Sequence, residues 1–180
     1  HGNEPAGIAA LYLLELLEKE ELLNPEIRII MTLANAEASK MFFEHIEQKP
    51  DNHFFAERLI YRSVDPKKNM NRLPKNMPLN ECCNSEHPDF SQAGRLAKIV
   101  EEFDIAIDIH SVSIQNSPPF FSSRQEPSYD LLKLLTGSSI RKTITHLSHY
   151  SGSTIFTSHF GKNRRGAQSI TFEAGFHEDP

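Results

Sequence analysis

The stretch SQAGRLAKIVEEFDIAIDIH, residues 91–110, decides the fold class of this 180-residue chain. In its first part apolar side chains recur at helical spacing, at Leu96, Ile99, Val100 and Phe103. This spacing predicts an amphipathic helix over residues 91–103 that packs on the core through these side chains, with Ser91 as its N-cap. The second part, IAIDIH, predicts a strand over residues 105–110 that ends in polar side chains. A helix followed directly by a strand is typical of an α/β protein.

Helices and strands alternate along the rest of the chain too. Periodic or apolar runs predict further helices at 5–23, 37–47 and 129–135, and further strands at 27–33 and 168–172. Most of the remaining residues, including 77–88 and 118–126, are expected to form loops. The alternation predicts a three-layer α/β/α sandwich with a mixed, largely parallel central sheet, whose active site gathers beyond the carboxyl ends of strands. His110 and Glu173 both stand at such a predicted strand end.

Composition and charge limit the classes of protein to which this chain can belong. Hydrophobic residues make up 38% and charged residues 24%, as in one ordinary globular domain that buries a core. The net charge of −5 gives no basic surface for nucleic acid. No apolar run reaches membrane-spanning length, and the adjacent Cys82 and Cys83 form no disulfide framework. We therefore expect a cytoplasmic protein with neither a nucleic-acid nor a membrane partner, while oligomeric state has no signal in the sequence.

The first motif that carries chemistry is His1-Gly2-Asn3-Glu4, which stands just before a helix expected to begin near Pro5. An imidazole and a carboxylate three residues apart can reach one metal ion, and zinc takes both in catalytic sites. Two alternatives stay open. His1 can be a solvated histidine beside a helix-capping Glu4, or its imidazole and a free terminal amine can together chelate copper.

A second group of candidate residues follows from the strand ends. His110 is a candidate for the third metal ligand, and since it lies 106 residues from Glu4, the fold would have to assemble any shared metal site. Asp108 shares a strand face with His110 and can orient its imidazole as a carboxylate partner. Glu173 can take a proton from an activated water and pass it to a leaving amine. The plainer alternatives are a strand-end histidine bonded to Asp108 and a surface glutamate on an edge strand.

Other polar groups offer weaker candidates. Asn71-Arg72 combines an amide with a guanidinium that can grip a substrate carboxylate through parallel hydrogen bonds, or can simply hold a loop. His146 and His149 have metal-ligand spacing, but no third ligand stands near them in the sequence. We expect the adjacent cysteines to be inert thiols, the alternative being an opportunistic metal site.

Taken in order, these motifs resemble those of the succinylglutamate desuccinylase/aspartoacylase family, a branch of the zinc carboxypeptidase superfamily. The family pattern is H-G-N-E, then N-R, then D-x-H, then a Glu-containing strand end followed by Gly. Here the motifs are His1 to Glu4, Asn71-Arg72, Asp108 to His110, and Glu173 to Gly175. The resemblance spans the chain from its first residue to the last predicted strand. It implies a zinc carboxypeptidase-like fold and a single zinc hydrolase domain over residues 1–180.

The resemblance also implies roles for these residues. The implied ligands of one zinc ion per chain are His1, Glu4 and His110. Asn71 and Arg72 would hold a substrate carboxylate, and Glu173 would be the general base and proton shuttle. The implied reaction is hydrolysis of a small-molecule N-acyl amino acid to the free amino acid and a carboxylic acid. Two alternatives are a zinc carboxypeptidase that acts on peptides and a non-catalytic binding domain of the same fold.

The chain departs from the family pattern at several positions. An arginine usually precedes the N-R pair, whereas Val64 stands there and the nearest candidates are Arg62 and, less well placed, Arg58. Another arginine usually precedes the catalytic glutamate and meets an acidic group of the substrate, a role that Arg164 or Arg165 would take. Family members also carry a strand ahead of the first motif and a C-terminal β-rich domain. We expect both to lie outside these 180 residues.

Overall fold

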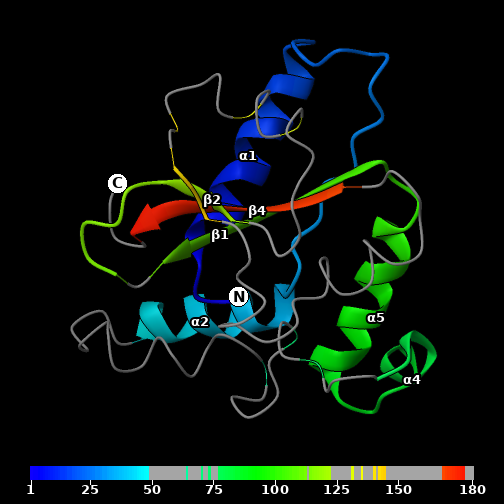
Figure 1. Cartoon of the computed structure of the whole chain (residues 1–180). Coiled ribbons are helices and arrows are strands. Elements are labelled where there is room, and N and C mark those ends of the chain that lie inside the picture. Colours follow the sequence, from blue (N-terminus) through cyan, green and yellow to red (C-terminus); the bar gives the residue numbers. More distant parts are fainter. Residues whose placement is uncertain are drawn as a thin grey trace.

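The sheet is built on two parallel strands that lie far apart in the sequence. In the computed structural model, β1 (Ile105–Val112) pairs in parallel with β4 (Gln168–Phe176). The other edge of β4 pairs antiparallel with β2 (Phe120–Ser122), which in turn runs parallel to β3 (Thr143–Ile144). The strand order is therefore β1-β4-β2-β3, and the predicted mixed sheet in an α/β protein is confirmed (Figure 1). The structure describes residues 1–48, 64, 70, 73, 77–112, 114–122, 131, 135, 140, 142–144 and 168–176.

Helices lie on both sides of this sheet. Figure 1 shows α1 (Pro5–Lys19) above it, and α2 (Ala36–Gln48) and α5 (Pro88–Val100) below it. All three helices were predicted, although α5 begins three residues earlier than expected, so Ser91 lies inside it and His87 is the N-cap. A short helix, α4 (Leu79–Cys83), occupies a stretch that was predicted to be loop. In the described part of the chain, none of the helices is long and apolar enough to cross a membrane.

The register of the strands sorts their side chains between the two faces of the sheet. Phe121 is paired with Phe172, and their rings lie 5.2 Å apart in an apolar cluster with Ile170 and Leu131. Because successive side chains of a strand point to opposite faces, the neighbours of these residues face the other way. That second face carries two rows of paired side chains, and each row runs across β1, β4 and β2. The rows are Asp108, Thr171 and Ser122, followed by His110, Glu173 and Phe120.

A second core lies between α4 and α5. Cys82, Ala93 and Leu96 are buried there together with Met70 and Leu73. Of the residues expected to face inward from α5, Leu96 is buried but Ile99 is exposed. Gly94 lets the two helices approach closely, since a Cβ at that position would lie 2.6 Å from the backbone nitrogen of Cys83.

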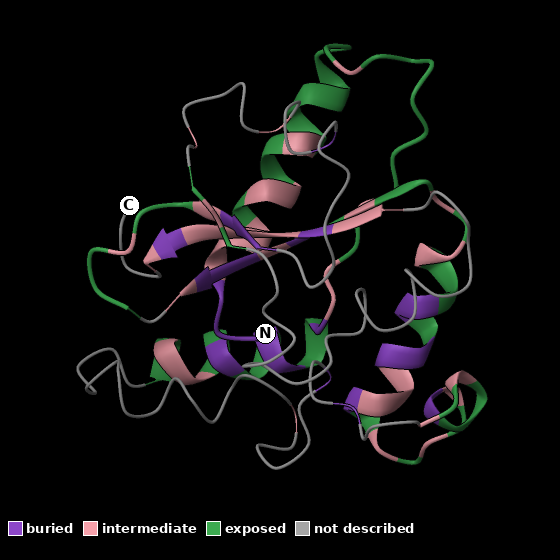
Figure 2. Ribbon diagram, viewed as in Figure 1, coloured by how far each residue is buried: buried purple, intermediate pink, exposed green. Residues whose placement is uncertain are grey.

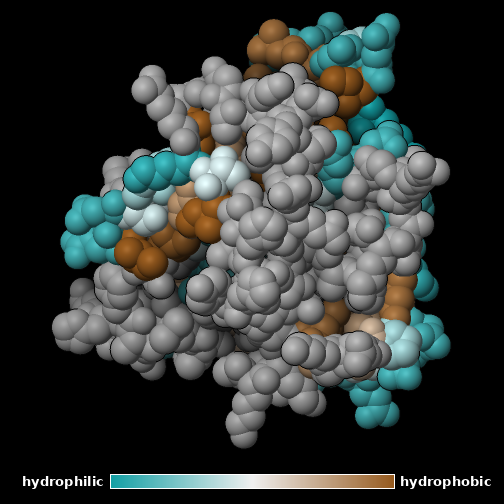
Figure 3. Space-filling model, in the orientation of Figure 1, coloured by the Kyte–Doolittle hydropathy of each residue, from teal (hydrophilic) through white to brown (hydrophobic). Residues whose placement is uncertain are grey.

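The first helix does not bury its apolar residues fully. Figure 2 shows no buried residue in α1, while α5 carries several. Tyr12 and Leu13 are both more than half exposed, as is Leu22 beyond the helix. Figure 3 accordingly shows apolar surface at the top of the view, over the C-terminal end of α1. The amphipathic pattern therefore predicted the helix correctly but overstated its burial.

The predicted strand at 27–33 was wrong. These residues form no strand, and Ile27, Ile29 and Ile30 are 59%, 41% and 46% exposed. The physical reason is that β-branched residues only fit a strand once a neighbouring strand supplies hydrogen-bond partners, and none of the described strands pairs with this run. Conversely, β2 formed in the predicted loop at 118–126, because β4 lies beside it.

Candidate metal centre

A single turn of backbone brings His1 and Glu4 together. The backbone N–H of Glu4 donates to the carbonyl oxygen of His1 over 3.3 Å, which closes a four-residue turn ahead of α1. In this turn His1 Nδ1 contacts Glu4 Oε1. Glu4 is the N-cap residue of α1, but its side chain makes no cap hydrogen bond. The helix-capping alternative is therefore wrong, since the carboxylate of Glu4 points to the histidine instead.

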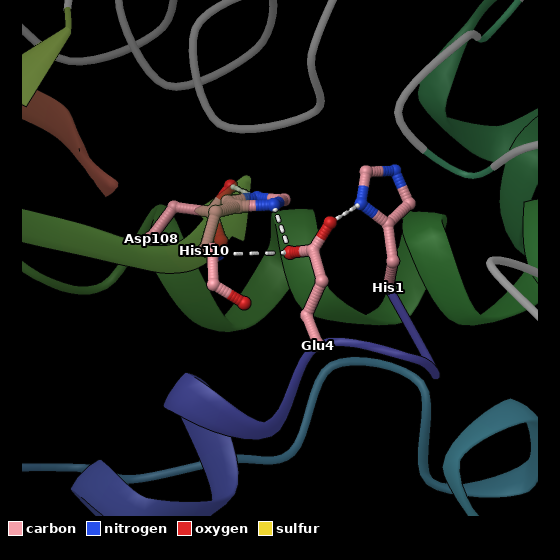
Figure 4. Close-up of polar contacts among 5 residues, drawn as sticks. His1, Glu4, Asp108 and His110 are labelled. Atoms are coloured by element: carbon pink, nitrogen blue, oxygen red, sulfur yellow. Dashed lines mark hydrogen bonds and ion pairs between the residues drawn. The ribbon is translucent and has the colours of Figure 1, made fainter. Parts of the chain in front are cut away.

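Strand β1 supplies the third residue of the site. His110 Nδ1 lies 2.7 Å from Glu4 Oε2, and the rings of His110 and His1 are 5.1 Å apart. Figure 4 shows Glu4 between the two imidazoles, each turned toward one of its carboxylate oxygens. One potential ligand atom from each residue lies within 4.8 Å of the other two. The structure thus brings together the three residues that the sequence proposed as metal ligands.

The centre is shielded from solvent. Glu4 is 6% and His110 is 8% exposed, and the His1 side chain is buried to a similar degree. This burial contradicts the alternative of a solvated histidine. His1 Nε2 is buried without a hydrogen-bond partner among the described residues. Buried polar atoms normally have a hydrogen-bond partner, so this nitrogen calls for an explanation.

Asp108 and Ser111 support the centre from β1. Asp108 Oδ2 lies 2.9 Å from His110 Nε2 and can accept its N–H, so that Nδ1, on the side of Glu4, is the ring nitrogen available to a metal ion. The backbone N–H of Ser111 donates to Glu4 Oε2 over 3.4 Å. The role of Asp108 was predicted from its strand face. That of Ser111 was missed, because a backbone donor leaves no signal in the side-chain sequence.

The charges of the site shift the pKa of His110 upward. Burial alone lowers the pKa of this imidazole, but the carboxylates of Asp108 and Glu4 outweigh burial and raise the pKa to about 10. A cation is therefore stabilised between these two carboxylates at neutral pH. The same negative charge would favour a metal ion bound by His110 and Glu4.

Glu173 lies on β4, directly beside His110 in the parallel register. It stands between two other strands, so the alternative of an edge-strand glutamate is wrong. Burial raises the pKa of Glu173 to about 6; the His110 charge opposes this rise, while Glu4 and Asp108 add to it. Neither strand ends at these residues as predicted, because β1 runs on to Val112 and β4 to Phe176.

The pairing of β1 with β4 becomes irregular directly after Glu173. The register shifts after His110, where Val112 is paired with Phe176, and Gly175 adopts a positive φ of 104°. An extra residue in one strand locally changes its twist and the direction of its side chains. A Cβ at Gly175 would lie 3.1 Å from the carbonyl oxygen of Ser117. The lack of a side chain at Gly175 therefore also leaves room for the loop that follows β1.

The predicted substrate-binding residues lie outside the described residues. Met70 and Leu73, which flank the Asn71-Arg72 pair in sequence, are both buried against the α4–α5 core. Of the cysteines, Cys82 is fully buried, and burial raises the pKa of its thiol, which fits an inert residue. The predicted residues that lie outside the described part are Arg58, Arg62, Asn71, Arg72, His146, His149, Arg164 and Arg165.

The donor set fits a divalent metal ion. Two imidazole nitrogens and one carboxylate are a known ligand set of catalytic zinc, and zinc bonds of about 2.0–2.2 Å would place the ligand atoms about 3.3 Å apart. One ligand atom from each of the three residues lies within 4.8 Å of the other two, so the three side chains can face one metal ion. The chain is thus an α/β protein with a candidate metal centre on one face of its sheet. Comparison with protein-family models, curated proteins and solved structures returned no match.

Proposed function

We propose that this chain is a zinc-dependent hydrolase that cleaves the amide bond of an N-acyl amino acid. The observation that carries the proposal is the convergence of His1, Glu4 and His110 beside Glu173 on the neighbouring strand. This arrangement supplies a metal site and a candidate base together. The proposal includes a three-layer, zinc carboxypeptidase-like sandwich, of the type found in the succinylglutamate desuccinylase/aspartoacylase family. The unpaired cysteines fit the cytoplasmic location that belongs to the same proposal.

The residues of the chain have distinct tasks in the proposed reaction. His1 and His110 would hold the zinc ion through a ring nitrogen, and Glu4 would hold it through its carboxylate. When bound, zinc polarises the acyl carbonyl and lowers the pKa of a water molecule toward neutrality. Glu173 would take a proton from the attacking water and, as the C–N bond breaks, deliver it to the leaving nitrogen. Asp108 holds the imidazole of His110 in the tautomer that keeps Nδ1 free for the metal.

The raised pKa of Glu173 supports its task. A general base works best when its pKa lies near the operating pH, because it must both accept and release the proton. A value of about 6 brings Glu173 closer to neutrality than an ordinary glutamate. In this proposal Asn71 and Arg72 anchor the substrate carboxylate. An arginine near the carbonyl, Arg62 or Arg58, stabilises the developing oxyanion, and Arg164 or Arg165 meets an acidic substrate group.

Zinc content and turnover test this function together. We expect about one zinc per chain in protein purified without chelator, and loss of zinc in His110→Ala, because each ligand contributes to affinity. His45→Ala removes a histidine of α2 outside the centre and should keep the metal. Zinc-loaded protein should then hydrolyse N-acyl amino acids faster than short peptides. A folded protein without zinc contradicts the proposal, and faster cleavage of peptides supports the carboxypeptidase alternative.

A further inference from the structure

We propose that Asp89 positions the segment that carries the Asn71-Arg72 pair and thereby supports binding of the substrate carboxylate. This inference rests on the proposed function, which gives the pair that task. Asp89 lies in the first turn of α5 and is only 1% exposed, yet the proposed mechanism does not use it. Burial of a carboxylate is costly unless hydrogen bonds compensate for lost hydration, so the partners of Asp89 indicate its role.

One carboxylate oxygen of Asp89 holds two other segments of the chain. Asn35 Nδ2 donates to Asp89 Oδ1 over 2.6 Å, and the backbone N–H of Val64 donates to the same oxygen over 3.3 Å. Asn35 is itself fixed, since its Oδ1 accepts the backbone N–H of Ala38 in the first turn of α2 over 3.1 Å. Asp89 therefore joins the beginnings of α2 and α5 to the backbone of Val64.

The face of α5 that carries Asp89 also holds the residues on either side of the pair. Asp89, Ala93 and Leu96 are spaced four and three residues apart, which places them on one face of the helix. Ala93 and Leu96 are buried in one apolar cluster with Met70 and Leu73. Met70 directly precedes the pair in the sequence, and Leu73 directly follows it. Two kinds of contact with one helix face thus attach the segment before and around the pair.

The hydrogen bond to Val64 explains why this position carries a carboxylate. An apolar side chain could fill the space between α2 and α5, but it could not accept the N–H of Val64. A guanidinium and an amide that grip a carboxylate through parallel hydrogen bonds must be held in one orientation. Asp89 contributes to that orientation through the backbone of the segment. It is a positioning residue and does not touch the substrate.

Substrates with and without a carboxylate test the inference. We would compare the N-acetyl amino acid that the zinc-loaded wild type hydrolyses fastest with its carboxamide, which lacks the charge that the pair grips. Asp89→Ala should raise KM for the acid by about 10-fold or more, as for a lost charge-assisted hydrogen bond, with little change in kcat. Zinc content and kcat/KM for the carboxamide should stay within about twofold of wild type. Asp89→Asn, which keeps an acceptor oxygen, should restore most of the binding.

A second variant removes the same hydrogen bond from its other side. Val64→Pro lacks the N–H but leaves Asp89 and Asn35 in place. It should raise KM for the acid as Asp89→Ala does, and it carries the test if Asp89→Ala fails to fold. Phe121→Leu, in the apolar cluster with Ile170, is the control for a general loss of stability and should leave KM for the acid unchanged.

Two further measurements show whether Asp89 acts through the pair. In the Arg72→Ala background, Asp89→Ala should have little additional effect on KM, because changes that remove one shared interaction are not additive. Amide hydrogen exchange of a peptide that contains Val64 should become faster in Asp89→Ala, while exchange of a peptide from α1 should not. This second measurement does not depend on enzyme activity.

Each outcome bears on one proposal or on both. An unchanged KM for the acid in folded Asp89→Ala or Val64→Pro overturns the role of Asp89 and leaves the hydrolase function intact. An equal loss for acid and carboxamide, a full effect in the Arg72→Ala background, or unchanged hydrogen exchange at Val64 does the same. Zinc-loaded wild type that hydrolyses no N-acetyl amino acid overturns both proposals. Circular dichroism of each variant separates a loss of binding from a loss of fold.

Discussion

Asp108 acts on the candidate metal centre through a single imidazole. Its Oδ2 lies 2.9 Å from Nε2 of His110, and the Nδ1 atom of the same ring lies 2.7 Å from Glu4. A carboxylate behind a ligand histidine fixes the ring and raises its basicity. The affinity of the centre for zinc should therefore depend on a residue that never touches the metal.

Asp108→Asn tests this dependence. The amide can still accept a hydrogen bond but lacks the negative charge, so we expect zinc affinity to fall by about 10- to 100-fold. Competition with a chromophoric chelator measures the change. Asp104→Asn, at an exposed position just before β1, is the matched control and should bind zinc as the wild type does. An unchanged Kd for Asp108→Asn would show that His110 needs no such support.

Glu173→Gln should stabilise the zinc-free protein while it removes activity. The pKa of Glu173 is raised from 4.5 to about 6, so between these pH values the folded protein binds more protons than the unfolded chain. Stability therefore falls as the pH rises through this window, and the penalty is fully present above about pH 6. The uncharged glutamine avoids this penalty. We expect a gain on the order of 1 kcal/mol at pH 7 that vanishes below pH 4.5, measured by urea unfolding.

The control for this change is a glutamate outside the sheet. Glu102 is largely exposed and faces Arg28 at 3.8 Å, so Glu102→Gln should alter stability by less than about 0.5 kcal/mol at either pH. If Glu173→Gln is no more stable than the wild type at pH 7, Glu173 carries no buried charge. The pKa argument for its role as base would then be withdrawn.

At the scale of elements, the contact between α4 and α5 depends on one glycine. A Cβ at Gly94 would lie 2.6 Å from the nitrogen and 2.9 Å from the Cα of Cys83, and both are backbone atoms that cannot move aside easily. We expect Gly94→Ala to destabilise the fold by about 1–3 kcal/mol, because the two helices must separate. Thermal or urea unfolding measures this loss.

Gly7 provides the matched control within α1. A Cβ there would meet its nearest atom, the carbonyl oxygen of Ile109, at an ordinary 3.6 Å. Gly7→Ala should therefore be neutral or should stabilise the protein by up to about 1 kcal/mol through helix propensity. Equal effects of the two substitutions would mean that helix propensity, rather than the contact with Cys83, governs both positions.

Whole-molecule stability should respond to zinc, because the centre joins the first turn of the chain to β1, 106 residues later. An ion that binds only the folded state adds about 2.7 kcal/mol when its free concentration is 100 times the Kd. For a chain of this length that gain corresponds to a rise in Tm of roughly 5–10 °C. Differential scanning calorimetry with and without zinc measures the shift. Magnesium, which prefers oxygen ligands, should have little effect, and a Tm indifferent to zinc in the wild type contradicts the assembled site.

Much of the candidate site could be predicted from the sequence, because each of its parts is encoded locally. The histidine and carboxylate of the first motif occupy one turn, and alternation along a strand is enough to place Asp108 on the face of His110. The long helices α1, α2 and α5 followed from periodicity in the same way, whereas the short helix α4 did not. The strand predicted at 27–33 failed because strand formation depends on a partner elsewhere in the chain, which a local pattern does not encode.

The sequence by itself therefore determined the residue types of the centre, the main helices and the two long strands of an α/β protein. Only the tertiary structure decided which residues meet. Parallel pairing of β1 with β4 placed Glu173 beside His110, and antiparallel pairing of β2 placed Phe120 beside Glu173. It also decided the charge state, since the carboxylates of Asp108 and Glu4 raise the pKa of His110 against the effect of burial, while burial raises the pKa of Glu173. The reason is that register and burial arise from contacts between segments distant in the chain, whereas periodicity and side-chain chemistry are local.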